Sequence, residues 1–339
     1  ETTYVGEPSP EQQHLRISEL SYHPYDALPQ YGELDVDNEQ FEFIELLNVS
    51  ATETVDLKNA SFSEGIEFTF DQFTPLAPGE RIVVVRDQAA FESRYGSGLP
   101  IGGVFQNETG LSNSGETLKL DDASGSTIVE FAYNDRGDWP DRADGPGSSL
   151  VVRASALADP DTDYNAGENW RASTAFGGTP GRAAVETSDV IVNEVVAHTN
   201  PPTTDAIELY NTSSAPVDLS GWWLSDTSDD YFKYTCEAGS ALEAGAYLVL
   251  DETDFNPGGG SNPTDFGLSA GGDDVWLLEP DAGGKPQRFA STVSFAATLS
   301  CLSLGRVPNG DTSFDLLPML RTTLGSAIAA HAPGGAILS

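Results

Sequence analysis

The amino-acid sequence predicts an all-β protein made of two tandem β-sandwich domains. The first observation behind this prediction is that the same motifs occur twice, in the same order. LRISELSYHP at 15–24 returns as VIVNEVVAH at 190–198, FEFIELLN at 41–48 as AIELYN at 206–211, and LAPGERIVVV at 76–85 as LEAGAYLVL at 242–250. Such an ordered repeat indicates a duplicated folding unit. The second observation is that short β-branched and apolar runs alternate with turns rich in the 34 Gly and 21 Pro, which favours an antiparallel sandwich or barrel.

The first copy has strand signals at 40–48, 66–70, 81–85 and 149–153, each an alternating or apolar run bounded by Gly, Pro or charge. Within 40–48, Ile44 and Leu46 share one face, and we expect them in the core together with their counterparts Ile207 and Leu209. The one convincing helical stretch is 87–96, which closes with Gly96.

The second copy has strand signals at 232–236, 246–250 and 274–278. A segment rich in Gly and small residues, 177–189, is the natural linker. The predicted organisation is therefore an N-terminal tail at 1–13, a first domain at 14–184, a second domain at 185–327 and a C-terminal tail at 328–339.

The charge balance excludes several classes of partner. Only 16 Lys and Arg stand against 53 Asp and Glu, a net charge of −37 at pH 7. Nucleic acid is therefore not an expected partner, because its phosphates need cationic neutralisation. No stretch of about 18 apolar residues exists, so no membrane insertion is expected. The chain begins at Glu1 rather than Met, which is expected of a processed secreted protein and equally of an excised fragment.

Both cysteines, Cys236 and Cys301, lie in the second copy. In an oxidising compartment they are expected to form a disulfide bond. Two separate buried thiols are the alternative that the sequence leaves open.

The best metal candidate is the stretch DPDTDYN, where Asp159, Asp161, Asp163 and Asn165 occupy alternate positions of a calcium-loop pattern. The pattern is incomplete, because Tyr164 stands where such loops have Gly and Trp170 where they have Glu. Calcium with a structural role is the cofactor expected, and a solvated acidic loop is the alternative.

Two further constellations have a chemical and a structural interpretation. Glu19 and Glu194 each precede a histidine by four residues, His23 and His198, but no nucleophile or zinc motif accompanies them. We expect each glutamate to bind backbone donors near a strand end. The second copy gathers aromatic residues that would suit either core packing or a sugar-stacking platform: Trp222, Trp223, Tyr231, Phe232 and Trp276. Adjacent residues face opposite sides of a strand, so at most one of the two adjacent tryptophans is expected in the core of a one-sided sheet.

With these motifs assembled, both copies resemble the lamin-tail domain of bacterial multidomain proteins. The resemblance rests on ISE (17–19) and VNE (192–194), FIELLN (43–48) and IELYN (207–211), VDLSGWWLSD (217–226), LSNSGE (111–116), and NWRASTAFGGTPG (169–181). It implies an immunoglobulin-like β-sandwich in each copy and no conserved chemistry. Two departures stand out. The first copy lacks the tryptophan of VDLSGWWLSD, and the second has GRVPNGDTSF (305–314) where the first has its closing motif.

These observations favour a non-enzymatic extracellular or cell-surface protein with a structural or adhesive role, such as a self-assembling filament or surface-layer subunit. The partners expected are further copies or other surface proteins. One of the tails is expected to link successive subunits, and in the N-terminal tail Tyr4 and Val5 are the expected anchors on a neighbouring sheet edge. Residues 1–13 are expected to be ordered only by contact with another subunit or with the far domain. The alternative is a carbohydrate-binding or accessory region of a larger secreted enzyme, with polysaccharide as partner.

Overall fold

The computed structural model describes residues 8–185, 187–200, 202–300, 302–313, 315–319 and 321–328. The chain divides into two compact units, residues 1–185 and 186–339. This division falls one residue after the boundary predicted between 184 and 185. Each unit is described by itself below.

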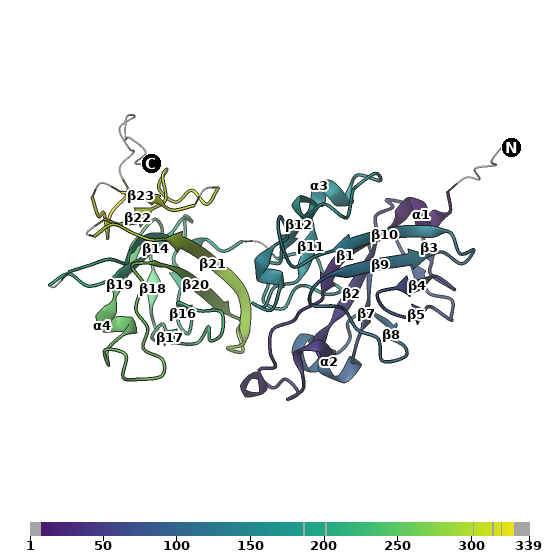
Figure 1. The fold of residues 1–339 in the computed structure, drawn as a ribbon, viewed down its shortest axis with the longest axis horizontal. Helices are drawn as coiled ribbons and strands as arrows, with labels where there is room; N and C mark the ends of the chain where they lie inside the picture. The colour runs from purple at the N-terminus through teal and green to yellow at the C-terminus, as the bar shows by residue number, and fades with distance from the viewer. Residues whose placement is uncertain are drawn as a thin grey trace. The chain divides into compact units, whose positions relative to one another are not determined.

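Among the described residues, unit 1 is built from a six-stranded and a four-stranded sheet that face each other, plus a small two-stranded ribbon (Figure 1). The six-stranded sheet has the order β12-β11-β1-β2-β7-β8: β12 (Trp170–Ala172), β11 (Leu150–Val152), β1 (Leu15–Ser21), β2 (Phe43–Asn48), β7 (Arg81–Val85) and β8 (Ile101–Val104). The four-stranded sheet has the order β10-β9-β4-β5: β10 (Thr127–Tyr133), β9 (Glu116–Asp121), β4 (Ser61–Glu64) and β5 (Phe68–Thr69). The ribbon pairs β3 (Val55–Asp56) with β6 (Pro75–Leu76).

The helices of unit 1 are short and lie in the connections. They are α1 (Pro10–His14), η1 (Pro29–Tyr31), η2 (Asn38–Phe41), α2 (Gln88–Tyr95), η3 (Asp141–Ala143), α3 (Ala154–Leu157) and η4 (Gly167–Asn169). The predicted helix at 87–96 is thus confirmed as α2. The Asp87 carboxylate caps its start by accepting from the Ala90 N–H at 2.8 Å, and Gly96 ends it with a positive φ of 86°.

Unit 2 repeats the plan with fewer strands. Its five-stranded sheet has the order β19-β14-β13-β22-β23 in the described residues: β19 (Tyr247–Asp251), β14 (Ala206–Asn211), β13 (Val190–Val196), β22 (Leu304–Gly305) and β23 (Leu317–Pro318). The facing sheet has the order β17-β16-β20-β21: β17 (Tyr234–Thr235), β16 (Trp223–Ser225), β20 (Gly272–Pro280) and β21 (Pro286–Ala296). A ribbon pairs β15 (Val217–Asp218) with β18 (Ala241–Leu242), and α4 (Glu252–Phe255) follows β19.

The two units bury corresponding residues in corresponding strands. Ile44 and Leu46 of β2 lie in the core of unit 1, and Ile207 and Leu209 of β14 lie in the core of unit 2, as predicted. Ile44 stands opposite Leu20 of β1, and Ile207 stands opposite Val195 of β13. The duplication is therefore visible in strand order and in register.

The first copy lacks the core tryptophan of the second, but a larger neighbouring residue fills the space instead. The Phe70 N–H donates to the Ala60 carbonyl, and the Cys236 N–H donates to the Trp222 carbonyl, so these are equivalent pairs of neighbours. All four residues are buried in their cores. Unit 1 thus pairs the small Ala60 with the large Phe70, whereas unit 2 pairs the large Trp222 with the small Cys236. Such exchanges conserve total volume, which cores tolerate best.

The segment just before the first strand belongs to unit 1. Residues Pro10–His14 form α1, with a capping box between Ser9 and Gln12. The Gln12 side chain donates to the Thr127 carbonyl of β10 at 3.0 Å. The prediction that residues 1–13 are ordered only by another subunit or by the far domain is therefore wrong for 8–13, because the cap and this edge contact hold them on their own unit. Tyr4 and Val5 lie outside the described residues.

One strand of unit 1 has no counterpart in the described part of unit 2. In unit 1, β8 lies parallel to β7 at the sheet edge, where the Val83 N–H donates to the Pro100 carbonyl at 2.8 Å. Its two glycines let aromatic rings approach: a Cβ at Gly102 would lie 2.7 Å from the Phe70 ring. In unit 2 the corresponding loop, 256–265, forms no strand, and β19 is the edge of its sheet.

We predict that Trp222→Ala destabilises unit 2 by about 3–5 kcal/mol, because it opens a cavity in a packed core. Adding Cys236→Phe should restore part of this loss, because it recreates the Ala60–Phe70 arrangement of unit 1. Cys236→Phe alone should destabilise by about 1–3 kcal/mol through overpacking. Calorimetric unfolding of the three variants measures this, and a double variant no more stable than Trp222→Ala would contradict the exchange.

Candidate functional site

Each unit carries two buried glutamates that face each other across its first two strands. Glu19 of β1 stands opposite Glu45 of β2, and Glu194 of β13 stands opposite Glu208 of β14. In both sheets the register shifts just before the first glutamate, which leaves Ser18 or Asn193 as the extra residue of a β-bulge. All four glutamates are at most 2 % exposed. Such groups are stable inside a protein only when they are hydrogen-bonded.

The bulge residue supplies the first donor in each unit. The Ser18 hydroxyl donates to Glu45 Oε1, and the Asn193 amide donates to Glu208 Oε1 at 2.8 Å. This explains why both copies have Asn or Ser directly before the first glutamate.

In unit 1 the other donors come from the closing segment of the domain. The Thr179 N–H donates to Glu19 Oε1 at 2.7 Å, and the Thr179 hydroxyl donates to Glu19 Oε2 at 3.1 Å. The Gly181 N–H donates to Glu45 Oε2 at 2.7 Å. We call the set Glu19, Glu45, Thr179 and Gly181 the carboxylate clasp of unit 1. It ties the end of the domain to its first two strands.

Unit 2 has the same clasp, formed by Glu194, Glu208, Thr323 and Gly325. The Thr323 N–H donates to Glu194 Oε1 at 2.9 Å and its hydroxyl to Glu194 Oε2, while the Gly325 N–H donates to Glu208 Oε2 at 2.6 Å. The counterpart of GTPG at 178–181 is therefore TTLG at 322–325, and not the stretch 305–314. The described part of that stretch, 305–313, instead follows β22 in the connection to β23, as 153–169 lies in the connection from β11 to β12.

Burial dominates the electrostatics of the clasps. It raises the pKa of Glu19, of Glu208 and of Glu45, the last to about 7, and the charge of Glu19 adds to the rise at Glu45. A cavity of about 180 Å³ lies beside the clasp of unit 1, and three arginines are among its lining residues: Arg81, Arg171 and Arg182. Arg81 pairs with Glu45 at 3.1 Å.

The histidines do not join these glutamates. His23 Nδ1 lies 2.7 Å from Asp144 Oδ1, and His198 Nδ1 lies 3.0 Å from the Thr298 carbonyl. The expectation that Glu19 and Glu194 bind backbone donors is confirmed. Thr179, Gly181, Thr323 and Gly325 were missed as their partners, although a Thr-x-Gly near the end of each copy is a visible signal.

The structure does not bring the four calcium candidates together. Asp159, Asp161, Asp163 and Asn165 are exposed. Asp163 Oδ1 accepts from the Asn165 N–H and from its side-chain amide, while Asn165 Oδ1 accepts from the Ala132 N–H of β10 at 2.9 Å. Among the residues that the structure describes, no three His, Cys, Asp or Glu side chains are grouped to hold a metal ion. The loop instead covers a sheet edge, and calcium binding stays a prediction.

This loop also contributes to the core through the residue between its acidic positions. Tyr164 is buried, with its ring 5.3 Å from that of Phe131, and its hydroxyl donates to the Ile17 carbonyl. The Trp170 indole N–H donates to the Tyr164 carbonyl at 2.9 Å. The two residues that break the calcium-loop pattern are therefore the ones that fix the loop to the sandwich.

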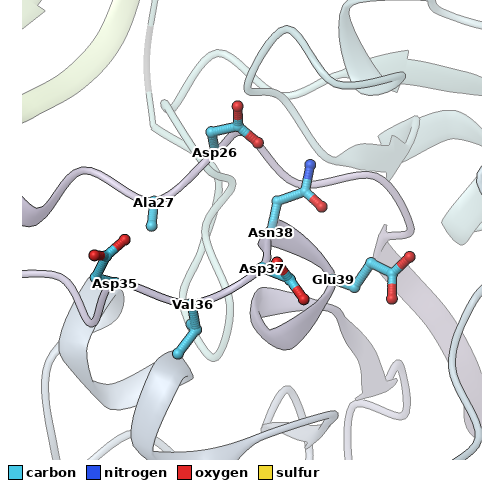
Figure 2. Close-up of a pocket in the computed structure, with 7 residues that line it drawn as sticks. All are labelled: Asp26, Ala27, Asp35, Val36, Asp37, Asn38 and Glu39. Atoms are coloured by element: carbon cyan, nitrogen blue, oxygen red, sulfur yellow. The ribbon is translucent and has the colours of Figure 1, made fainter.

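An acidic cavity of about 490 Å³ lies in unit 1 between two stretches of loop. Its lining residues, shown in Figure 2, are Asp26, Ala27, Asp35, Val36, Asp37, Asn38 and Glu39. Glu39 already pairs with Arg86 at 3.1 Å. The four carboxylates create a negative potential that attracts cations in general, and no convergent set of ligands is formed.

Two of the remaining candidates of unit 2, Cys236 and Trp222, are core residues. Cys236 is a buried free cysteine, and burial raises the pKa of its thiol to about 11. Cys301 lies outside the described residues, so the disulfide stays a prediction. Trp222 and Trp223 are both buried, at 4 % and 7 % exposure, but only Trp222 belongs to the core cluster of unit 2, so the expectation that at most one of them is core is confirmed.

We predict that the free energy of unfolding of unit 1 falls as pH rises from about 5 to about 8. A carboxyl whose pKa is raised on folding stabilises the fold below its unfolded pKa, here 4.5, and this contribution is lost as pH rises through the folded value of about 7. The upper bound is about 3 kcal/mol for Glu45. Glu45→Gln should flatten the slope, and the exposed Glu64→Gln should not. Chemical denaturation across this pH range measures it, and equal slopes in all three proteins would contradict the assignment.

We predict that Asn165→Ala lowers the stability of unit 1 by about 1 kcal/mol, because the Ala132 N–H loses its partner. Asp161→Asn, in the same loop, should leave the melting temperature unchanged. Thermal unfolding with calcium and with a chelator measures both effects. If calcium raises the melting temperature and Asp161→Asn abolishes the gain, the loop is a calcium site after all.

In the described part of the chain, no helix is long and apolar enough to cross a membrane. No curated protein matches the chain. The family model of the lamin tail domain matches residues 8–135 and again residues 183–292, which together are more than half of the chain. Lamin tail domains are non-catalytic, immunoglobulin-like modules, and the two units are structural or interaction modules of this kind. The chain belongs to the lamin tail domain family, of which it contains two tandem copies.

Proposed function

We propose that this chain is a non-enzymatic structural or adhesive subunit of an extracellular or cell-surface assembly, and that its copies associate through the segment before α1. The observation that carries the proposal is that the buried carboxylates serve as hydrogen-bond acceptors within the fold. In both units they accept hydrogen bonds from the closing segment of the same domain. Groups that would serve acid–base chemistry are thus used to hold the fold.

The charge supports partners reached by specific contacts. With a net charge of −37, two copies repel each other at long range, and salt or divalent cations weaken this repulsion. Association therefore needs an apolar or backbone-mediated contact. Such a composition suits a saline, extracellular setting with other surface proteins, and calcium there would act chiefly by screening.

The geometry of α1 supports the segment before it as the linker. Gln12 fixes α1 to the edge strand β10 of its own unit, so residues 1–7 are joined to the fold at a sheet edge. Tyr4 and Val5 are the large apolar residues of that segment. They are suited to anchor an added strand on another copy, where main-chain hydrogen bonds supply the remaining affinity.

The aromatic residues of unit 2 give no support to polysaccharide binding. The Trp223 and Phe232 rings meet edge to face at 5.1 Å, and those of Tyr231 and Trp276 lie 5.3 Å apart. Tyr210 and Tyr247 stack on each other at 4.6 Å. These contacts occupy ring faces that a sugar would need.

We predict that deleting residues 1–7 lowers the particle mass in solution, because it removes the apolar anchor and leaves α1 intact. Tyr4→Ser with Val5→Ser should act in the same direction, whereas Thr2→Ser with Thr3→Ser is the matched control. Light scattering at several salt concentrations measures the mass. The proposal fails if the unaltered protein is a monomer at every concentration, or if the deletion leaves its oligomers unchanged.

A further inference from the structure

Unit 2 has an open strand position at the outer edge of β19. In its sheet the Asn211 N–H donates to the Ala246 carbonyl, and bonded pairs then alternate along β14 and β19. By this alternation the N–H and carbonyl groups of Tyr247 and Val249 point away from β14. Among the described residues, no strand pairs with this side of β19.

The equivalent position in unit 1 is filled by the chain itself. Val83 stands opposite Glu45, as Val249 stands opposite Glu208. The Val83 N–H donates to Pro100 of the segment that forms β8, and the Phe105 N–H donates to the Val85 carbonyl. The segment 100–105, PIGGVF, thus runs parallel to β7 and closes that edge.

The core of unit 2 shows the consequence of the open position. Ile82 and Phe68, which β8 flanks in unit 1, are 8 % and 5 % exposed. Their counterparts by register, Leu248 and Tyr234, are half-buried and pack against the core. An added strand at β19 would cover both.

We propose that the C-terminal segment 333–338 of the same chain occupies this position as a strand parallel to β19. Its sequence, PGGAIL, shares with PIGGVF a proline, a Gly-Gly pair and the apolar residues that follow. The glycines would lie against Tyr234 and Cys236, as Gly103 and Gly102 lie against Phe68 and Phe70. The proposal does not depend on the association proposed above.

The path of the chain leads to this edge. The Ile328 N–H donates to Asn309 Oδ1 at 3.0 Å, and the Asn309 amide donates to the hydroxyl of Tyr247, the first residue of β19. The four residues 329–332 span up to about 13 Å when extended. The Ile328 side chain itself lies over Gly305 of β22, so this linker has to run from there past Asn309 to Tyr247. A segment arriving at the Tyr247 end also has the direction that a parallel strand requires.

The test is hydrogen exchange at the Val249 amide in the full chain and in a variant that ends at Ile328. We expect exchange to become about tenfold faster or more in the shortened chain, because Val249 loses its acceptor. Added peptide 329–339 should restore the protection. Ile337→Asp should act like the deletion, and Ala330→Asp, which adds the same charge before the strand, should not. The Val83 amide, protected by β8 in every variant, reports that the protein is folded.

Two results would overturn the proposal. Equal exchange at Val249 in the full and shortened chains would show that the edge stays open. Protection that grows with protein concentration would show that the segment is donated by a second copy. This second result would support self-association while excluding the assignment to the same chain. Deletion of residues 1–7 tests the association separately, so the failure of one proposal leaves the other measurable.

Discussion

The fold of each unit depends on one interaction, the hydrogen bonding of two buried carboxylates by the end of the domain. Glu19 and Glu45 lie in the first two strands, and burial of unpaired carboxylates is costly. Thr179 supplies its donors from 160 residues beyond Glu19, and Gly181 supplies its donor from 136 residues beyond Glu45. The closing segment can therefore bind only after the sheet has formed, and the sheet is fully stable only once the segment is bound. The same dependence exists in unit 2 between Glu194 and Thr323.

Other differences between the copies show which requirements are strict. A core must be filled, but the filling residue can sit on either of two neighbouring strands, as Phe70 and Trp222 do. An asparagine at the end of the second strand is kept, because its buried amide binds two points of the turn that follows and one point of a distant strand. In unit 1, Asn48 donates to the carbonyls of Glu53 and Leu76 and accepts from the Ser50 N–H. Core volume can be supplied by a large residue at either of two neighbouring positions. A residue that makes a set of directed hydrogen bonds cannot be moved in this way.

The sequence was sufficient to predict what depends on periodicity and repetition. Ile44 and Leu46 could be assigned to the core because alternation and the second copy agree. Spacing alone does not show where side chains point: the Asn165 side-chain oxygen accepts from the Ala132 N–H while its amide donates to Asp163, and calcium binding by this loop stays a prediction. Only the glutamate half of the clasp could be predicted from the sequence. A strand glutamate near a turn indicates a hydrogen-bonded role, but donors so far along the chain are found only when the fold brings them together.

The clasps also limit what these domains can do. A carboxylate that acts in catalysis must face substrate in a cavity with a free lone pair or an exchangeable proton. Each oxygen of Glu19 and Glu194 instead accepts from Thr179 or Thr323. A substitution that freed these carboxylates for catalysis would also release the closing segment of the domain. Stability and catalysis therefore compete for the same residues. Loops and sheet edges carry no such constraint, and there the two copies differ most. A parallel strand pairs with β7 in unit 1, whereas among the described residues no strand pairs with the corresponding edge of β19.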